Sequence, residues 1–302
     1  MEHHAQSGIL EPVPAHGRYL IFSVRAHATP AALVESLRCL ALLADGQSAV
    51  VALGAALVQA LGARVPGLRE MPDFSGHGVQ VPSTPMALWC WLRGADRGDL
   101  LLQSRALEHA VSPALHLDRV LDAFRHGDPH AEHGRDLTGY EDGTENPHGE
   151  AALSAALVPE GLPGLSGSSF VAVQQWLHDM DTFAAMAPHD QDHAMGRRRS
   201  DNEELADAPA SAHVKRTAQE NFSPEAYVLR RSMPWAVSQQ CGLFFVAFGC
   251  TLDAFEAQMR RMAGQDDGVV DALFGFSRPL SGAYLWCPPM RVGRLDFRQL
   301  GL

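Results

Sequence analysis

The chain has 302 residues, of which 46% are hydrophobic and 20% are charged, and its formal net charge is −11 at pH 7. This length is enough for one large domain or two ordinary ones with a sizeable core. The negative charge argues against binding to nucleic acid, whose phosphates repel acidic surfaces. No apolar run reaches 18 residues, so no membrane span is expected.

The cysteines number five, an odd count, and no two have the Cys-x-x-Cys spacing. This pattern favours neither a disulfide framework nor a structural zinc site. Reduced cysteines fit a cytoplasmic protein. Residues 1–14 contain two glutamates, two prolines and no apolar core segment, so we expect no secretion signal there.

The first 135 residues predict the element order β-α-β-β-α-β. Residues 18–24 are rich in β-formers and predict a strand. Thr29 and Pro30 then predict the start of a helix, with Thr29 as N-cap, and leucines follow at helical spacing. Further strands are expected at residues 48–53, 85–92 and 120–124, and helices at 55–61 and 99–107.

The second half repeats this order. Strands are expected at residues 169–176, 227–232, 243–248 and 283–286, and helices at 180–187 and 252–262. The order β-α-β-β-α-β is that of the ferredoxin-like fold. The sequence therefore predicts an α+β protein with two ferredoxin-like halves, residues 1–135 and 136–302, which meet in a region rich in glycine, proline, histidine and aspartate.

Residues 139–147 read Gly-Tyr-Glu-Asp-Gly-Thr-Glu-Asn-Pro and form the most informative segment of the chain. Glycines accept positive φ and let the backbone approach a flat or charged ligand closely. The segment therefore predicts a loop around a ligand, with Asp142 directed at it. Taken alone, Asp142 is equally typical of a turn residue that accepts bonds from local backbone amides.

Two other segments carry candidate residues. His213 follows a polar, proline-containing stretch, which predicts a loop or a helix start. Arg230 and Ser232 lie two apart on an expected strand, so both are expected to face one pocket, with Arg231 turned away as a salt-bridge partner. Taken singly, His213 is typical of a surface or core histidine, Arg230 of an ion pair, and Ser232 of a side chain that satisfies a backbone group.

A further segment, which is rich in histidine, has side chains of the kind that bind metal ions. His126 and His130 are four residues apart, a zinc-compatible spacing on a helix. Gly127 and Pro129 interrupt any such helix, so we interpret the segment as a solvated linker. Asp179 is interpreted as a helix N-cap, although a His178–Asp179 pair beside a cofactor is an alternative.

Four sequence blocks together resemble the dye-decolorizing peroxidases, a family of haem enzymes. Gly-x-x-Asp-Gly at 139–143 matches the family signature. The blocks at 142–147, 174–179, 211–216 and 229–234 resemble the bacterial cytoplasmic branch, often called class B. The resemblance implies a haem b cofactor, held mainly by the C-terminal half of the chain.

The resemblance also implies a role for each matching position. His213 corresponds to the proximal ligand of the haem iron. Asp142 and Arg230 correspond to the distal acid and arginine. Ser232 stands where some relatives have asparagine and is the third catalytic candidate. The remaining expected haem contacts are Gly143, Thr144, Glu145 and Asn146.

The implied activity is reduction of hydrogen peroxide and oxidation of dyes or phenolic one-electron donors through a ferryl intermediate. An aspartate base loses function only when it is protonated, so activity is expected to favour mildly acidic pH. A homo-oligomer is also expected. One rival is a haem-binding protein for storage, delivery or iron release, which would use the same His213. A second rival is a ferredoxin-like binding module without haem.

Overall fold

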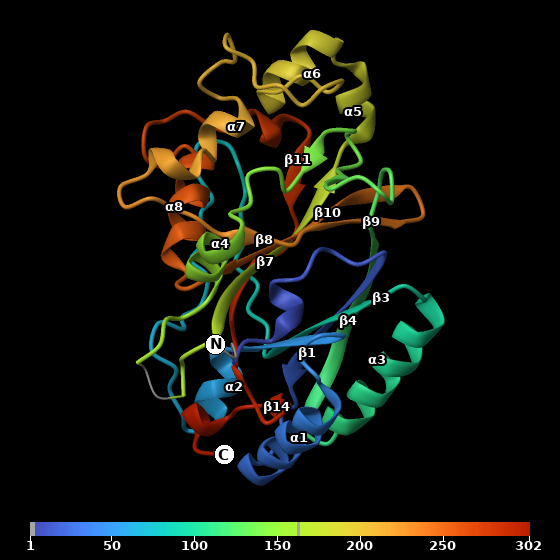
Figure 1. Ribbon diagram of the computed structural model, residues 1–302, viewed down its shortest axis with the longest axis vertical. Helices are drawn as coiled ribbons and strands as arrows, with labels where there is room; N and C mark the ends of the chain where they lie inside the picture. Colours follow the sequence, from blue (N-terminus) through green and yellow to red (C-terminus); the bar gives the residue numbers. More distant parts are fainter. Residues whose placement is uncertain (1–3, 162–163) are drawn as a thin grey trace.

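Both halves of the chain fold with the ferredoxin-like strand order, and Figure 1 shows them stacked along the long axis of the molecule. The computed structural model describes residues 4–161 and 164–302. The N-terminal half lies at the lower end of Figure 1, with α1 and α3, and most of the C-terminal half lies at the upper end, with α5 to α8. The last residues of the chain return to the lower end, where the C-terminus lies near α1. The predicted α+β class is confirmed.

The N-terminal half is an antiparallel sheet of order β2-β3-β1-β4, covered by two long helices. Its strands are β1 (His16–Val24), β2 (Ala49–Gly54), β3 (Leu88–Gly94) and β4 (Leu115–Phe124). Its helices are α1 (Pro30–Leu43), α2 (Ala55–Ala60) and α3 (Arg97–Val111). The Thr29 hydroxyl accepts a hydrogen bond from the Ala32 amide, which confirms the predicted N-cap of α1.

The C-terminal half repeats this order as β12-β7-β10, with β8 and β9 along the outer edge of β10. Its strands are β7 (Ser169–His178), β8 (Leu229–Arg230), β9 (Met233–Val237), β10 (Gln240–Gly249), β11 (Ser277–Pro279) and β12 (Ala283–Cys287). Its helices are α5 (Met180–Ala185), α6 (Pro188–Met195), α7 (His213–Arg216) and α8 (Asp253–Met262). The helix α4 (Gly149–Ala156) and the hairpin of β5 (Gly134–Arg135) and β6 (Glu141–Asp142) precede them, and the hairpin of β13 (Met290–Arg291) and β14 (Arg294–Leu295) follows.

The strand expected at residues 227–232 is wrong in its extent. β8 covers two residues, and regular pairing with β10 resumes only at Met233. Between them the Ser232 hydroxyl, rather than a backbone carbonyl, accepts the hydrogen bond from the Val246 amide at 3.2 Å. Local side-chain bonding of this kind competes with the strand ladder.

The helix expected at residues 180–187 ends earlier, at Ala185, and a second helix begins at Pro188. A proline has no amide hydrogen to continue a helix and favours the first position of a new one. The predicted N-cap role of Asp179 is confirmed, because its carboxylate accepts from the Thr182 amide at 2.9 Å.

The two sheets join at both edges into a closed ring of strands. β2 pairs with β12 on one side, β4 pairs with β9 on the other, and β7 pairs with β10 within the C-terminal half. The neighbouring strands β2 and β3 are buried on both faces: every residue of β2, and every residue from Leu88 to Arg93 of β3, is buried. The interior is aromatic: Tyr19 stacks on Phe244 with ring centroids 3.9 Å apart, and so links the two halves.

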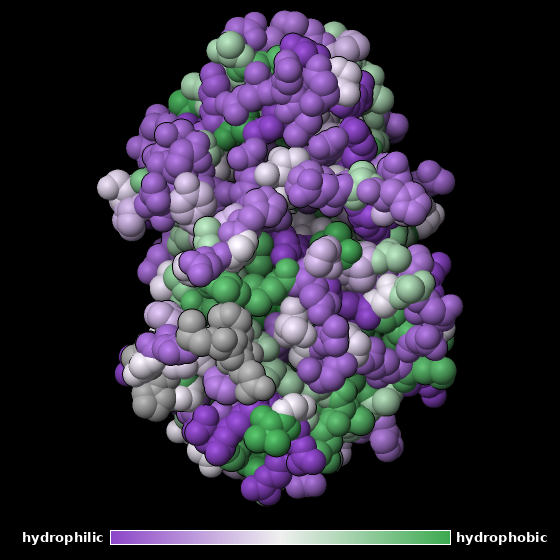
Figure 2. Space-filling view, viewed as in Figure 1, coloured by the Kyte–Doolittle hydropathy of each residue, from purple (hydrophilic) through white to green (hydrophobic). Residues whose placement is uncertain are grey.

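The two ends of the molecule differ at the surface. Figure 2 shows hydrophilic residues over the end that carries α5 and α6, and hydrophobic patches toward the other end, where α1 lies. The exposed Leu42 and Leu43 belong to the last turn of α1. Within the described residues, no helix is both long and apolar enough to cross a bilayer.

Candidate active site

The loop at residues 139–147 is a tight backbone structure fastened to β8. Gly139 and Gly143 have φ values of +93° and +85°, which glycine adopts without strain. The Asn146 side chain binds both backbone polar groups of Arg230, which lies beside it in space. Its Oδ1 accepts from the Arg230 amide at 2.7 Å, and its Nδ2 donates to the Arg230 carbonyl at 3.0 Å. The loop and β8 are therefore held as one unit, although they are far apart in the sequence.

This fastening brings Asp142 and Arg230 together. Arg230 Nη2 lies 3.9 Å from Asp142 Oδ1, and their side chains are 18% and 25% exposed. Burial raises the pKa of Asp142 above that of an ordinary aspartate; Arg230 opposes this shift and the nearby Asp136 adds to it. Burial is thus a stronger influence on the Asp142 pKa than the charge of Arg230.

Both side chains reach a cavity that also receives His213, the first residue of α7. The prediction that His213 stands at a loop or helix start is confirmed. Much of the remaining lining is apolar and comes from β7, β10, α8 and the segment after it: Trp176, Leu243, Phe245, Phe255, Met259, Met262 and Leu273. Every residue that lines the cavity lies between Asp136 and Ser277, in the C-terminal half.

His213 is oriented by a carboxylate that the sequence did not reveal. Its Nδ1 lies 2.8 Å from Asp271 Oδ2, and the Asp271 side chain is fully buried. Asp271 Oδ1 accepts from the Leu273 amide at 2.8 Å and caps the short 3-10 helix Ala272–Gly275. An aspartate before a helical turn is common, so only proximity in space identifies it. With Nδ1 engaged, Nε2 is the nitrogen left for a metal.

The cavity fits a flat iron macrocycle. It offers one imidazole, backed by a buried carboxylate, as an axial ligand, which is how haem iron is held in peroxidases. It offers apolar and aromatic side chains for the face of the ring. It also brings an acid and a cation, Asp142 and Arg230, to the same space without closing it.

The expected haem-contact residues divide between the two sides of the loop. Thr144 and Glu145 line the cavity with His213. Gly143 and Asn146 instead line a second pocket on the outer side, together with Ser232. Asp142 and Arg230 line both spaces and form the wall between them.

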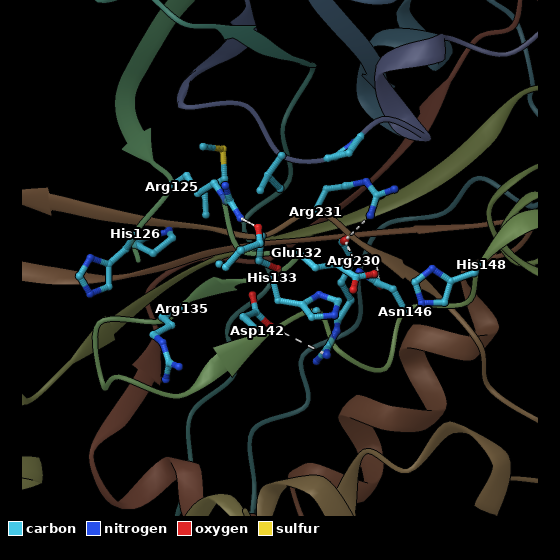
Figure 3. Close-up of a pocket in the computed structure, with 18 of the residues that line it drawn as sticks. Arg125, His126, Glu132, His133, Arg135, Asp142, Asn146, His148, Arg230 and Arg231 are labelled. Carbon is cyan, nitrogen blue, oxygen red and sulfur yellow. Dashed lines mark hydrogen bonds and ion pairs between the residues drawn. The ribbon is translucent and has the colours of Figure 1, made fainter. Parts of the chain in front are cut away.

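The guanidinium group of Arg231 points away from that of Arg230, as expected (Figure 3). Arg231 lines the second pocket with Arg230 and Ser232. Its guanidinium donates to the carbonyl oxygens of Ile9 and Leu10, at 3.2 Å and 2.6 Å, instead of forming the expected salt bridge. The N-terminal segment that supplies these carbonyls could not be placed from the sequence.

A buried chain of three side chains completes the cavity wall. Ser277 Oγ lies 2.7 Å from His178 Nδ1, and His178 Nε2 lies 3.1 Å from Asp136 Oδ2. Burial opposes ionisation of Asp136, but its bonds with His178 and Thr138 outweigh that and lower its pKa to about 2. His178 thus pairs with Asp136 rather than with its sequence neighbour Asp179, and Asp136 is a further residue that the sequence did not single out.

Comparison with known proteins agrees with this geometry. The family model described as Dyp-type peroxidase, C-terminal, matches residues 133–292. A dye-decolorizing peroxidase of Rhodococcus erythropolis is 31% identical over 255 residues, which cover 81% of this chain and 73% of the relative. The dye-decolorizing protein from V. cholerae superimposes with a TM-score of 0.82 at 27% identity, over 93% of this chain and 96% of that one.

A further solved structure carries the cofactor. A DypB variant from Rhodococcus jostii, in complex with haem, is similar with a TM-score of 0.80 at 25% identity, over 92% of this chain and 94% of that one. The relatives are peroxidases by name, so neither a haem-storage role nor a module without haem is favoured. The chain belongs to the DyP-type peroxidase family, and it is a haem peroxidase that uses peroxide and an electron donor.

Proposed function

We propose that His213 is the axial ligand of the haem iron and that Asp142 and Arg230 act together on the bound peroxide. One observation carries the proposal: these three side chains reach one cavity, although they come from three separate segments of the chain. Asp271 supports the first role, because a carboxylate on Nδ1 fixes the ring and makes Nε2 a better ligand.

The protein's own contribution is to move protons and balance charge. When bound, haem supplies the iron that takes up peroxide and holds its two oxidising equivalents. The ionised Asp142 carboxylate accepts a proton from one peroxide oxygen and returns it to the other, which leaves as water. Arg230, 3.9 Å away, stabilises the negative charge that develops as the O–O bond breaks.

Asn146 and Ser232 have supporting parts in this proposal. Asn146 binds both backbone polar groups of Arg230 and so positions the Arg230 guanidinium group beside Asp142. Ser232 Oγ bonds the Val246 amide and keeps β8 on β10 where the regular ladder is interrupted. Thr144 and Glu145 contact the haem edge, and Gly143 gives the loop its turn.

We further propose that the electron donors are dyes or phenols, that the chain divides into an N-terminal ferredoxin-like half at 1–135 and a C-terminal ferredoxin-like half with the haem site at 136–302, and that the enzyme is a cytoplasmic homo-oligomer. The names of the relatives support the first point. The repeated strand order supports the second. The five cysteines are free, which suits a reducing compartment.

The decisive experiment replaces the proposed ligand. His213→Ala should abolish the Soret band or move it to that of a protein without an imidazole ligand, and haem titration should show weaker binding. The matched control is His116→Ala, because this imidazole is 60% exposed on β4, in the other half. A His213→Ala protein with a normal spectrum and full haem affinity would falsify the assignment.

A further inference from the structure

The second pocket lies where the two halves of the chain meet. It has a volume of about 450 Å³ and is lined by residues from the N-terminal segment, from 125–135, from 142–148 and from 230–234. Figure 3 shows the arginine and histidine side chains around it, with a dashed line joining Asp142 and Arg230. Because these two residues also line the haem cavity, the pocket shares a wall with it.

The pocket gathers positive charge in a protein whose net charge is −11. Four arginines line it against two acids, Glu132 and Asp142. Two of the arginines, Arg125 and Arg231, are held without being neutralised. Arg125 donates to the carbonyls of Pro129 and Ala131, and Arg231 to three carbonyl oxygens of the backbone.

Carbonyl oxygens orient a guanidinium but carry no net charge, so these two cations keep their full charge in the wall. Burial, with Arg93 nearby, lowers the pKa of Arg231 to about 10, which is the mark of a cation without a carboxylate partner. The side chain still carries its charge at neutral pH. An anion that enters the pocket would offset the unfavourable free energy of keeping this charge buried, and would accept charge-assisted hydrogen bonds.

The rest of the lining suits an aromatic body. Leu10, Pro12 and Val13 contribute apolar surface from the N-terminal segment, and Met233 and Pro234 contribute it from the start of β9. His133 and His148 add imidazole groups that donate or accept hydrogen bonds. A ligand with an aryl ring and one negative group therefore matches both parts of the wall.

We propose that this pocket binds an aromatic electron donor that carries a carboxylate, namely a phenolic carboxylate, next to Asp142 and Arg230. The carboxylate contacts Arg125 and Arg231, and the ring lies against the apolar wall. This inference rests on the proposed function and deepens it by naming the donor class and its place.

The chemistry balances with the established activity. Each phenol loses one electron to the enzyme and one proton from its O–H bond, and becomes a phenoxyl radical. Two phenols supply the two electrons and two protons that convert one hydrogen peroxide into two waters. The carboxylate takes no part in the bond changes, and its only role is to hold the donor beside the wall that the pocket shares with the haem cavity.

The kinetic test compares two donors with the same ring, syringate and its uncharged methyl ester, on the haem-loaded enzyme. Arg125→Gln should raise the KM of syringate about tenfold, the effect of losing about one charge-assisted contact. It should change the KM of methyl syringate less than twofold. Arg105→Gln on the exposed face of α3 is the matched control and should change neither.

A binding test does not depend on turnover. 3,4,5-Trimethoxybenzoate has no phenol to oxidise, and calorimetry should show that it binds the wild type and binds Arg125→Gln about tenfold more weakly, with affinity falling as salt is added. This readout also covers the case in which the variant loses the fold of residues 125–131, because the salt dependence is measured on the wild type.

The possible outcomes distinguish a failure of the donor-pocket inference from a failure of the proposed function. The proposed donor site would be overturned if Arg125→Gln raised the KM of syringate and of its ester equally, or if the affinity for trimethoxybenzoate did not depend on salt. The pocket would then serve only as a path for peroxide. Absence of turnover with either donor, together with absence of a Soret band, would instead overturn the proposed function. Loss of the preference for syringate in Arg125→Gln, with the ester still oxidised, supports the inference.

Discussion

The two halves share one strand order but differ in the first crossover, and this difference creates the haem cavity. In the N-terminal half the crossover from β1 to β2 is a single helix, α1, of 14 residues. Its Leu33, Leu37 and Leu40 are at most 2% exposed and fill the space over the sheet. A long amphipathic helix leaves no room for a ligand.

In the C-terminal half the equivalent crossover, from β7 to β8, covers residues 179–228 and breaks into α5, α6 and α7. α5 and α7 have only six and four residues, so this segment covers the sheet less completely than α1 does. The face of β10 that carries Leu243 and Phe245 stays open and lines the cavity. A ferredoxin-like unit thus gains a cofactor site when its crossover is long but poorly helical.

The sharpest test of this contrast is chemical, at the wall of the cavity. Asp142→Asn should slow the reaction with peroxide by about 10²–10⁴-fold, because the amide cannot accept the proton. Glu141→Gln is the control: its carboxylate is held by Arg135 at 3.0 Å, and its loss should cost little. Stopped-flow mixing with peroxide measures both, and the opposite order would mean that Glu141 is the base.

The raised pKa of Asp142 gives this reaction a pH dependence. The carboxylate must be ionised to accept a proton, so the rate should fall as pH drops through its pKa, starting at a higher pH than for an ordinary aspartate. A raised pKa in the folded state also means that the ionised group destabilises the fold at neutral pH. Asp142→Asn should therefore increase the free energy of unfolding of the apoprotein at pH 7, and a decrease would count against burial as the cause.

The buried pair of Asp136 and His178 should be the most sensitive point of the C-terminal half. Asp136→Asn removes one partner of a buried pair and is expected to cost about 3–5 kcal/mol of unfolding free energy. The folded-state pKa is lowered from 3.8 to about 2, so this stability is present above 3.8 and is lost as pH falls toward 2. Urea unfolding of the wild type and of Asp136→Asn at several pH values measures the difference in their free energies of unfolding. This difference should become smaller as pH falls from 3.8 toward about 2, and a constant difference would refute the ionic contribution.

A pair of leucine substitutions compares the two crossovers directly. Leu37→Ala, in the filled core beneath α1, should cost about 2–5 kcal/mol through loss of burial and a new cavity. Leu243→Ala should cost the apoprotein less, because this side chain already borders open space and is only partly buried. Denaturant melts of the apoproteins measure both costs, and equal losses would show that the cavity is as tightly packed as the core.

The smallest expected effect concerns the support of the axial ligand. Asp271→Asn should weaken haem binding about 10–100-fold, because the carboxylate no longer fixes His213 or increases its basicity. The matched control is Asp190→Asn on α6, whose carboxylate is 66% exposed beside another histidine. Haem titration followed at the Soret band measures the change, and unchanged affinity in Asp271→Asn would leave the aspartate only its capping role.

The sequence by itself determined the class of fold and the residues that meet in the cavity. Strand and helix positions follow from local patterns, such as the Thr29–Pro30 helix start, because these bonds form within a few residues. Asp142, His213 and Arg230 were found because the sequence blocks that contain them together resemble a known family, although each residue taken singly has an ordinary structural interpretation. The prediction was weakest at residues 227–232, where one side-chain bond from Ser232 interrupts a strand.

Only the tertiary structure decided which partners these residues have. Asp271 meets His213 across 58 residues, Asp136 meets His178 across 42, and Asn146 holds Arg230 across 84. The histidine-rich segment, interpreted as a solvated linker, supplies one wall of the arginine-lined pocket. None of these contacts leaves a periodic signal, because they depend on how the loops of the two halves pack and not on the conformation of any one segment.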